Sequence, residues 1–296
     1  MLLTDKYRIV PSVSDIKTRN DCDTSAFLGY YELSVPLVCA SMHALYTYEA
    51  NENIRKAGSL FVRPRFNSLN DIATDRDFVD DIAAISVNMA TAHLVAAMLP
   101  KYAILSIEIA NGYITELHET IKRVKKIRPD LYVMAGTVAE ETGAIALYEA
   151  GANAILVGIG VGSACQTAQN TGVGLPLDVS LQRIASLELE CDIVACGGIK
   201  TYGEIPICLA LGADMVMSGR LFAGCNDVKS KIYYGETSPL NGKTTHIEGT
   251  EFVVPQINKS SGDVIREAKE HLQSTMSYVG AYDLMQFSQR VKLEKI

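Results

Sequence analysis

Eight short apolar runs, each separated from the next by a segment with helical spacing, constrain the fold of this chain more than any other feature. From Pro36 onward the runs are PLVCAS, SLFVRP, AAISVN, AILSIEIA, LYVMAG, AILVGIG, CDIVACGG and DMVMSGR. Between them lie segments such as ITELHETIKRVKKIRP, whose apolar residues recur at intervals of three and four and which end in Pro or Gly. Repeated βα units of this kind build parallel sheets. Eight units predict an α/β protein with a closed (β/α)8 TIM barrel, and not an open doubly wound sheet.

The size of the chain agrees with one barrel. With 296 residues, 48% of them hydrophobic, it can bury a large core, so we expect a single domain over residues 1–296. The polar stretch 225–259 is too long for an ordinary loop and is expected to form a flap over the barrel mouth after the eighth strand. The tail at 262–296 has a helical pattern and is expected to pack outside the barrel.

Charge and cysteine usage exclude several classes of protein. The formal charge of −7 argues against a nucleic-acid partner, and the basic stretch 122–128 is interpreted as a solvated helix face. No apolar run approaches the about 20 residues that span a bilayer, and the first residues lack a signal-peptide core. The seven cysteines show no C-x-x-C pair and no zinc-ligand spacing, which predicts reduced thiols. We therefore expect a cytoplasmic protein without a membrane partner.

The most informative segment is VGIGVGSACQTAQNTGVGLP, residues 157–176, which includes the end of the sixth run. In barrels the reactive groups lie at the C-terminal ends of strands. Glycines at this density let backbone groups approach a ligand closely, and we expect nearby N–H donors to favour the thiolate of Cys165. A nucleophile is our interpretation of Cys165. The alternative, an inert buried thiol, is expected for Cys39, Cys191 and Cys208.

These residues carry a family resemblance. GIGVGSACQT resembles the cysteine loop of the IMP dehydrogenase and GMP reductase superfamily. PLVCASM resembles its first-strand motif, IVACGGIKTYGEIPICLALGADMVMSGRLFAG its phosphate-binding strands, and MSYVGA its C-terminal signature. The resemblance implies a thiolate that adds to carbon 2 of a purine nucleotide, and a hydride that moves between that carbon and a nicotinamide.

Three features favour the reductase branch of this family. No arginine occurs between Arg220 and Arg266, where the dehydrogenases carry a water-activating flap arginine. IANGY and YYGE resemble the reductase loops, and no insertion of regulatory-module length follows the second strand. The implied reaction is NADPH-dependent conversion of GMP to IMP with release of ammonia, and NADH is not excluded. Oxidation of IMP, as in the dehydrogenases, and a non-catalytic purine-nucleotide-binding barrel stay as alternatives.

The resemblance also implies roles for individual residues. Thr167 and Glu248 would be the acid–base pair that handles departing ammonia on the adduct of Cys165. The implied substrate positions are Ser41, Met42, Ser163, Cys196, Gly197, Gly198, Gly219, Arg220, Tyr233, Glu236 and Gly249, with a rim salt bridge as the alternative for Arg220. The implied cofactor positions are Glu108, Asn111, Gly112 and Thr137. The carbonyls of Gly160, Gly162 and Cys165 match a monovalent-cation site, and whether K+ binds here stays open. The family's assembly implies a homotetramer.

Several positions depart from the family pattern. Cys196 stands where the family has an aspartate that accepts hydrogen bonds from the ribose, and Glu108 and Thr137 replace an aspartate and an asparagine. His43 replaces an acid, and Glu236 replaces a methionine. Drift in a working reductase and a changed substrate, such as a deoxynucleotide or a modified purine, are both compatible with these changes. The joint presence of the three catalytic candidates argues against a non-catalytic barrel.

Overall fold

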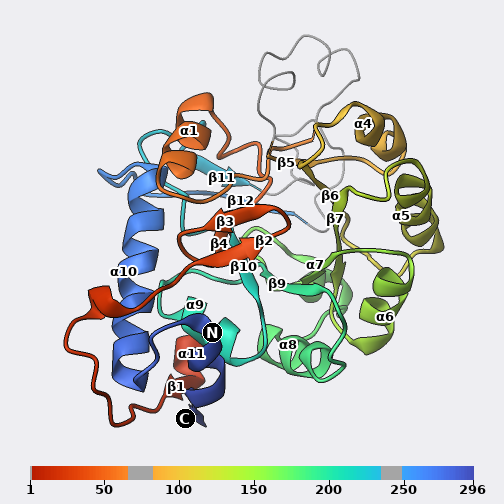
Figure 1. Cartoon of the computed structure of the whole chain (residues 1–296). Coiled ribbons are helices and arrows are strands. Elements are labelled where there is room, and N and C mark those ends of the chain that lie inside the picture. The colour runs from red at the N-terminus through yellow and green to blue at the C-terminus, as the bar shows by residue number, and fades with distance from the viewer. Residues whose placement is uncertain (1, 66–82, 235–248) are drawn as a thin grey trace.

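The computed structural model describes residues 2–65, 83–234 and 249–296, and its centre is a curled parallel sheet (Figure 1). Seven strands follow the order β4-β10-β9-β8-β7-β6-β5. Their bounds are Leu37–Cys39 (β4), Ala84–Ser86 (β5), Ile104–Glu108 (β6), Tyr132–Val138 (β7), Ala154–Val157 (β8), Asp192–Cys196 (β9) and Met215–Ser218 (β10). All neighbouring strands are parallel, as repeated βα units require.

Residues 60–63 join the two edges of this sheet. The amide of Val62 donates to the carbonyl of Cys39 at 3.0 Å, which attaches the segment to β4. On its other side, the amide of Arg63 donates to Ala84 at 2.9 Å and the amide of Ser86 donates to Arg63 at 2.8 Å, which attaches it to β5. The second apolar run thus completes the ring, and the predicted (β/α)8 barrel is confirmed.

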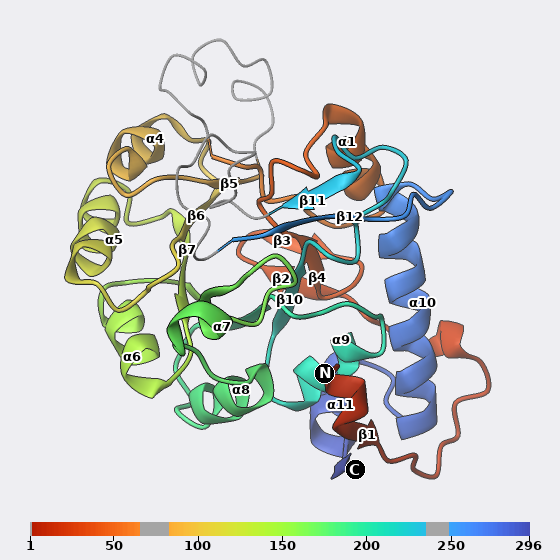
Figure 2. The same ribbon diagram turned by 180° about the vertical axis from the view of Figure 1, so that it is seen from behind.

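Helices surround the barrel (Figure 2). They are α1 (Tyr48–Lys56), α4 (Ala92–Met98), α5 (Thr115–Ile127), α6 (Glu141–Glu149), α8 (Leu177–Ala185) and α9 (Glu204–Ala210). Helix α5 shows the reason for this arrangement, because Leu117, Ile121 and Val124 recur at helical spacing and are buried, whereas Lys122 and Lys126 are exposed. The prediction of a solvated face is confirmed for Lys122, Arg123 and Lys126. It is wrong for Lys125 and Arg128, which are partly buried and donate to backbone carbonyls.

A hairpin that the sequence did not predict covers the N-terminal end of the barrel. It consists of β2 (Ala26–Leu28) and β3 (Tyr31–Leu33), and its Gly29 lies against Tyr132, the first residue of β7. Leu28 and Leu33 are buried in one cluster with barrel-interior side chains such as Val38, Ile104 and Met134. The opposite end, where the βα loops meet, is therefore the end available to a ligand.

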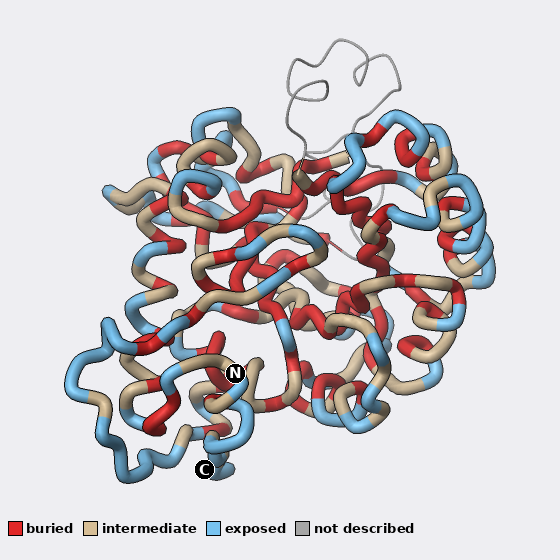
Figure 3. The backbone as a smooth tube through the Cα atoms, viewed as in Figure 1, coloured by how far each residue is buried: buried red, intermediate tan, exposed pale blue. Residues whose placement is uncertain are grey.

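The C-terminal tail packs against the outside of the barrel as α10 (Ser261–Val279) and α11 (Leu284–Arg290). Figure 3 shows buried positions recurring along the inner side of α10. The helical expectation is wrong for the last residues, because β13 (Leu293–Lys295) pairs antiparallel with β1 (Tyr7–Ile9). Three residues are too few to show a periodicity, and their partner strand lies at the other end of the sequence. Two short 3-10 helices, Leu3–Asp5 and Arg19–Asp21, precede the barrel.

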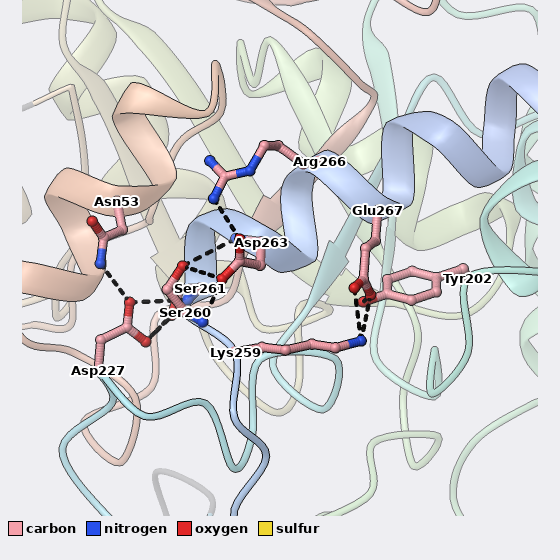
Figure 4. A network of polar contacts seen from close by, with 9 residues as sticks. All are labelled: Asn53, Tyr202, Asp227, Lys259, Ser260, Ser261, Asp263, Arg266 and Glu267. Carbon is pink, nitrogen blue, oxygen red and sulfur yellow. Dashed lines mark hydrogen bonds and ion pairs between the residues drawn. The ribbon is translucent and has the colours of Figure 1, made fainter.

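Strands β11 (Ile232–Tyr234) and β12 (Glu251–Val253) form an antiparallel pair at the two ends of the predicted flap. Residues 235–248 lie outside the described part of the chain, so the flap itself stays a prediction. Its base is fixed by Asp227, which accepts hydrogen bonds from the amide and hydroxyl of Ser261 and from the amide group of Asn53 (Figure 4). The flap base is therefore tied to the first turn of α10 and to α1.

Candidate active site

The loop after β8 holds Cys165 at the barrel mouth. Its amide donates to the carbonyl of Gly162 at 3.0 Å, and helix α7 (Thr167–Thr171) begins two residues later. The Cys165 thiol donates to the Thr167 hydroxyl oxygen, with Sγ and Oγ1 3.3 Å apart. Cys165 also forms a backbone bridge with Gly249. The two predicted catalytic residues of this loop are thus adjacent, and the end of the flap segment lies beside them.

Partial exposure separates Cys165 from Cys39 and Cys208, two of the three thiols that we expected to be inert. Cys39 and Cys208 are fully buried, and burial raises the pKa of each thiol. Cys191 is partly exposed where a buried thiol was expected, although burial still raises its pKa to about 11. All three stay protonated at neutral pH.

The loops after β8 and β9 form a cradle suited to an anion. Gly197 and Gly198 both have left-handed φ angles, +89° and +82°, which a side chain would strain. A Cβ on Gly197 would lie only 3.3 Å from the amide nitrogen of Gly162, so the two loops touch. The Ser163 hydroxyl is buried there without a hydrogen-bond partner in the structure. A buried, unpartnered hydroxyl beside glycine backbone fits a phosphate group.

Close packing at Gly219, the residue after β10, gathers further predicted positions. A Cβ on Gly219 would lie 2.4 Å from Met42 Sδ and 2.7 Å from the Tyr233 hydroxyl. Burial is the main cause that raises the pKa of Tyr233, so its hydroxyl keeps its proton. Arg220 forms no ion pair with a carboxylate of the described residues, and its guanidinium carbon lies 6.0 Å from the ring centre of Phe252. Within the described chain, the salt-bridge alternative for Arg220 has no partner.

Glu108 ends β6 and directs its carboxylate into the barrel mouth. The hydroxyls of Ser41 and Ser106 donate to its two oxygens at 2.8 and 2.7 Å, and the Arg65 guanidinium donates to its backbone carbonyl at 3.1 Å. Ser106 and Arg65 were not predicted. The available signal for Ser106 was a hydroxyl in an apolar strand two residues before Glu108, which places both side chains on one face.

Cys196, at the end of β9, is a neutral neighbour of these groups. Burial raises the pKa of its thiol most, and the negative charge of Glu108 raises it further. Its Sγ lies 3.9 Å from Met217 Sδ. The side chain beside the anion cradle is therefore a neutral thiol packed on a buried thioether, not a charged acceptor.

The loop after β6 is hydrogen-bonded to the end of β7 at the predicted cofactor positions. The amide of Gly112 donates to the Thr137 carbonyl at 2.9 Å, and the Thr137 amide donates to Ile109 at 2.9 Å. A Cβ on Gly112 would lie 2.6 Å from the Thr137 oxygen, so no larger residue fits without a shift. Asn111 is exposed and its side-chain oxygen accepts from the amide of Tyr113 at 3.1 Å. The loop after β6 and the end of β7 therefore form one side of the barrel mouth, held together by backbone hydrogen bonds.

Two predicted residues, Glu236 and Glu248, lie outside the described residues. The proposed cation ligands Gly160, Gly162 and Cys165 all belong to the loop after β8, where the Gly162 carbonyl already accepts one hydrogen bond. Among the described residues, His, Cys, Asp and Glu form no cluster that would hold a metal ion. No helix in that part of the chain is both long and apolar enough to cross a membrane.

Comparisons with known proteins agree on one family. The model of the IMP dehydrogenase / GMP reductase domain matches residues 2–296. GMP reductase of Lactococcus lactis subsp. cremoris (strain SK11) is 31% identical over 95% of this chain and 91% of its own length. GMP reductase of Helicobacter pylori (strain G27) is 31% identical over 95% of this chain and 92% of its own. A crystal structure of a GMP reductase from Trypanosoma brucei in complex with guanosine 5'-monophosphate shares the fold, with a TM-score of 0.87 at 17% identity, covering 100% of this chain and 95% of the other.

Proposed function

Because the chain belongs to the IMP dehydrogenase / GMP reductase family, we propose that it catalyses the reductive deamination of GMP to IMP, with NADPH as the hydride donor. The observation that carries the proposal is the Cys165 thiol beside the Thr167 hydroxyl, in a glycine-rich loop at the only end of the barrel that the hairpin leaves uncovered. Relatives named GMP reductase at 31% identity, from three genera, are consistent with it.

In the proposed reaction Cys165 is the nucleophile and Thr167 passes on a proton. The Cys165 thiolate forms a bond to carbon 2 of the purine, and the exocyclic amine takes up protons and leaves as ammonia. NADPH, held by Asn111, Gly112 and Thr137, would supply the hydride that carbon 2 accepts, and the Cys165 sulfur would then leave as thiolate. Thr167, whose Oγ1 lies 3.3 Å from the sulfur, would pass a proton to the departing amine, and Glu248 is proposed as the second member of the acid–base pair.

The anion cradle is proposed to bind the nucleotide phosphate. Gly197, Gly198 and Gly219 would supply backbone amides and Ser163 its unpartnered hydroxyl, while Arg220 would add a charged contact at the rim. The base would lie between the nucleophile and the packed side chains at the other end of the mouth. The residues proposed to line it are Ser41, Met42, Tyr233, Glu236 and Gly249.

The loop after β6 and the end of β7, which are hydrogen-bonded to each other, are proposed to hold the nicotinamide. Their fixed backbone fits this role, because a hydride donor must meet carbon 2 in one geometry. Asn111, Gly112 and Thr137 would make the contacts. Carbonyl oxygens are ligands of K+, so the carbonyls of the cysteine loop are a reasonable site for that ion. We further propose a homotetramer, and a cytoplasmic location that fits seven free cysteines.

The test is to mix the protein with NADPH and GMP and to follow the loss of the nicotinamide absorbance. Cys165→Ala should abolish turnover and leave GMP binding by calorimetry intact. Cys191→Ala is the matched control, because it removes another partly exposed thiol at the far end of β9 and should keep full activity. Oxidation of IMP by NAD+ without reduction of GMP would instead identify a dehydrogenase, and binding without either reaction would identify a non-catalytic barrel.

A further inference from the structure

The carboxylate of Glu108 reaches across the mouth of the barrel. In the strand order, β5 and residues 60–63 lie between β6, which Glu108 ends, and β4, which precedes Ser41. Nevertheless Ser41 Oγ donates to Glu108 Oε2 at 2.8 Å. The second oxygen, Oε1, accepts from Ser106 at 2.7 Å. Two hydroxyls from different strands thus hold the carboxylate in one orientation inside the ring.

Cys196 lies within the electrostatic reach of this carboxylate. Cys196 is the last residue of β9, and β7 and β8 lie between β9 and β6. The side chains of Cys196 and Glu108 must therefore both point into the barrel to influence each other. Cys196 immediately precedes the Gly197–Gly198 turn, and the nearby Cys165 also raises the pKa of the Cys196 thiol. It therefore lies between the nucleophile and the anion cradle.

The chemistry of a nucleotide places its sugar at this point. When the purine is bonded to Cys165 and the phosphate lies in the anion cradle, the ribose must lie between them, because the ribose links the base to the phosphate. The neutral thiol of Cys196, packed on Met217 Sδ, is a weak partner for hydroxyl groups. A carboxylate, whose two oxygens accept from two donors, matches a vicinal diol.

We propose that Glu108 is the specificity-determining residue that accepts hydrogen bonds from the ribose hydroxyls, so that the substrate is a ribonucleotide and not a 2'-deoxyribonucleotide. The proposal rests on the proposed function, because it needs the purine at Cys165. In this proposal Glu108 contacts the nucleotide and not the cofactor, for which the family resemblance implied it. The proposal also decides against a deoxynucleotide as the substrate. Ser41 and Ser106 are positioning residues for the carboxylate.

Calorimetric titration with GMP and with 2'-deoxy-GMP, without NADPH, tests this assignment. The unmodified protein should bind GMP at least about tenfold more tightly than the deoxynucleotide, as expected for a hydrogen bond to a charged group. In Glu108→Gln and in the shorter Glu108→Asp this ratio should fall close to one, because GMP loses the contacts of two hydroxyls and the deoxynucleotide loses only that of its 3'-hydroxyl. Glu149→Gln, which removes an exposed carboxylate on α6, should keep the original ratio.

Several outcomes would overturn the assignment. Equal affinities for the two nucleotides in the unmodified protein would do so, as would a ratio that survives in Glu108→Gln. If the Glu108 variants do not fold, Ser106→Ala keeps the carboxylate and loses one of its positioning bonds, so GMP affinity should fall more than the affinity for the deoxynucleotide. A purely structural role would weaken both nucleotides equally. Absence of binding by either nucleotide would refute the proposed function itself, whereas equal binding would refute only the role of Glu108.

Discussion

Replacing Asp227 should loosen the base of the predicted flap. Asp227 is 5% exposed, and its carboxylate accepts from the Ser261 amide at 3.0 and 2.9 Å, from the Ser261 hydroxyl at 2.8 Å and from Asn53 at 2.9 Å. Asp227→Ala leaves the two Ser261 donors buried without partners, because Ser261 is fully buried, while the half-buried Asn53 can turn to water. At about 1–3 kcal/mol for each orphaned buried donor, the free energy of unfolding should fall by about 2–6 kcal/mol.

A second carboxylate in the same network supplies the matched control. Glu267 forms an ion pair with Lys259 at 2.7 Å, but the two side chains are 31% and 43% exposed. Glu267→Gln should therefore cost only about 0–1 kcal/mol. Figure 4 shows both contacts at the start of α10.

The assay is urea denaturation followed by circular dichroism, together with the KM for GMP. Asp227→Ala should unfold at a clearly lower urea concentration and raise KM, because β11 would lose its fixed starting point, and Glu267→Gln should do neither. Equal losses of stability in the two variants, or an Asp227→Ala loss below about 1 kcal/mol, would show that burial does not set the strength of these contacts.

Three further changes have defined outcomes. Thr167→Val removes the hydroxyl that accepts from Cys165 and should lower kcat about 100-fold or more with little change in nucleotide affinity, in steady-state rates and calorimetry. Gly112→Ala places a methyl group 2.6 Å from the backbone oxygen of Thr137, near the end of β7, and should raise the KM for NADPH more than the KM for GMP. Burial alone would raise the pKa of Asp178, but hydrogen bonds, chiefly from Lys6, hold it below its usual value, so its stabilising effect exists above about pH 4 and is lost in more acidic solution. Asp178→Asn should therefore unfold earlier than the unmodified protein at pH 7 in urea titrations, and the gap should close as the pH falls below about 4.

The sequence predicted the barrel because each strand and each helix carries its own periodic signal. It also predicted the nearness of Cys165 and Thr167, because two residues within one loop cannot lie far apart. The contact of Glu108 with Ser41 could not be predicted in this way. It depends on how far a side chain reaches across a closed ring, and that distance is set by the packing of the whole barrel.

The features that were missed are short and depend on distant partners. The β2–β3 hairpin and the β1–β13 pair have three-residue strands, too short to display an alternation of two. Their stability comes from what they cover and from what they pair with. Ser106 was overlooked because a single hydroxyl in an apolar run resembles an ordinary strand residue until the carboxylate above it is seen.

The pairing of β1 with β13 has a practical consequence for engineering. Tyr7 and Lys295 face each other in that ladder, so the first and last strands are neighbours in space although 288 sequence steps separate them (Figure 1). A short glycine-serine linker could therefore close the chain into a ring, and cutting that ring at an exposed surface turn would yield a circular permutant with the same barrel.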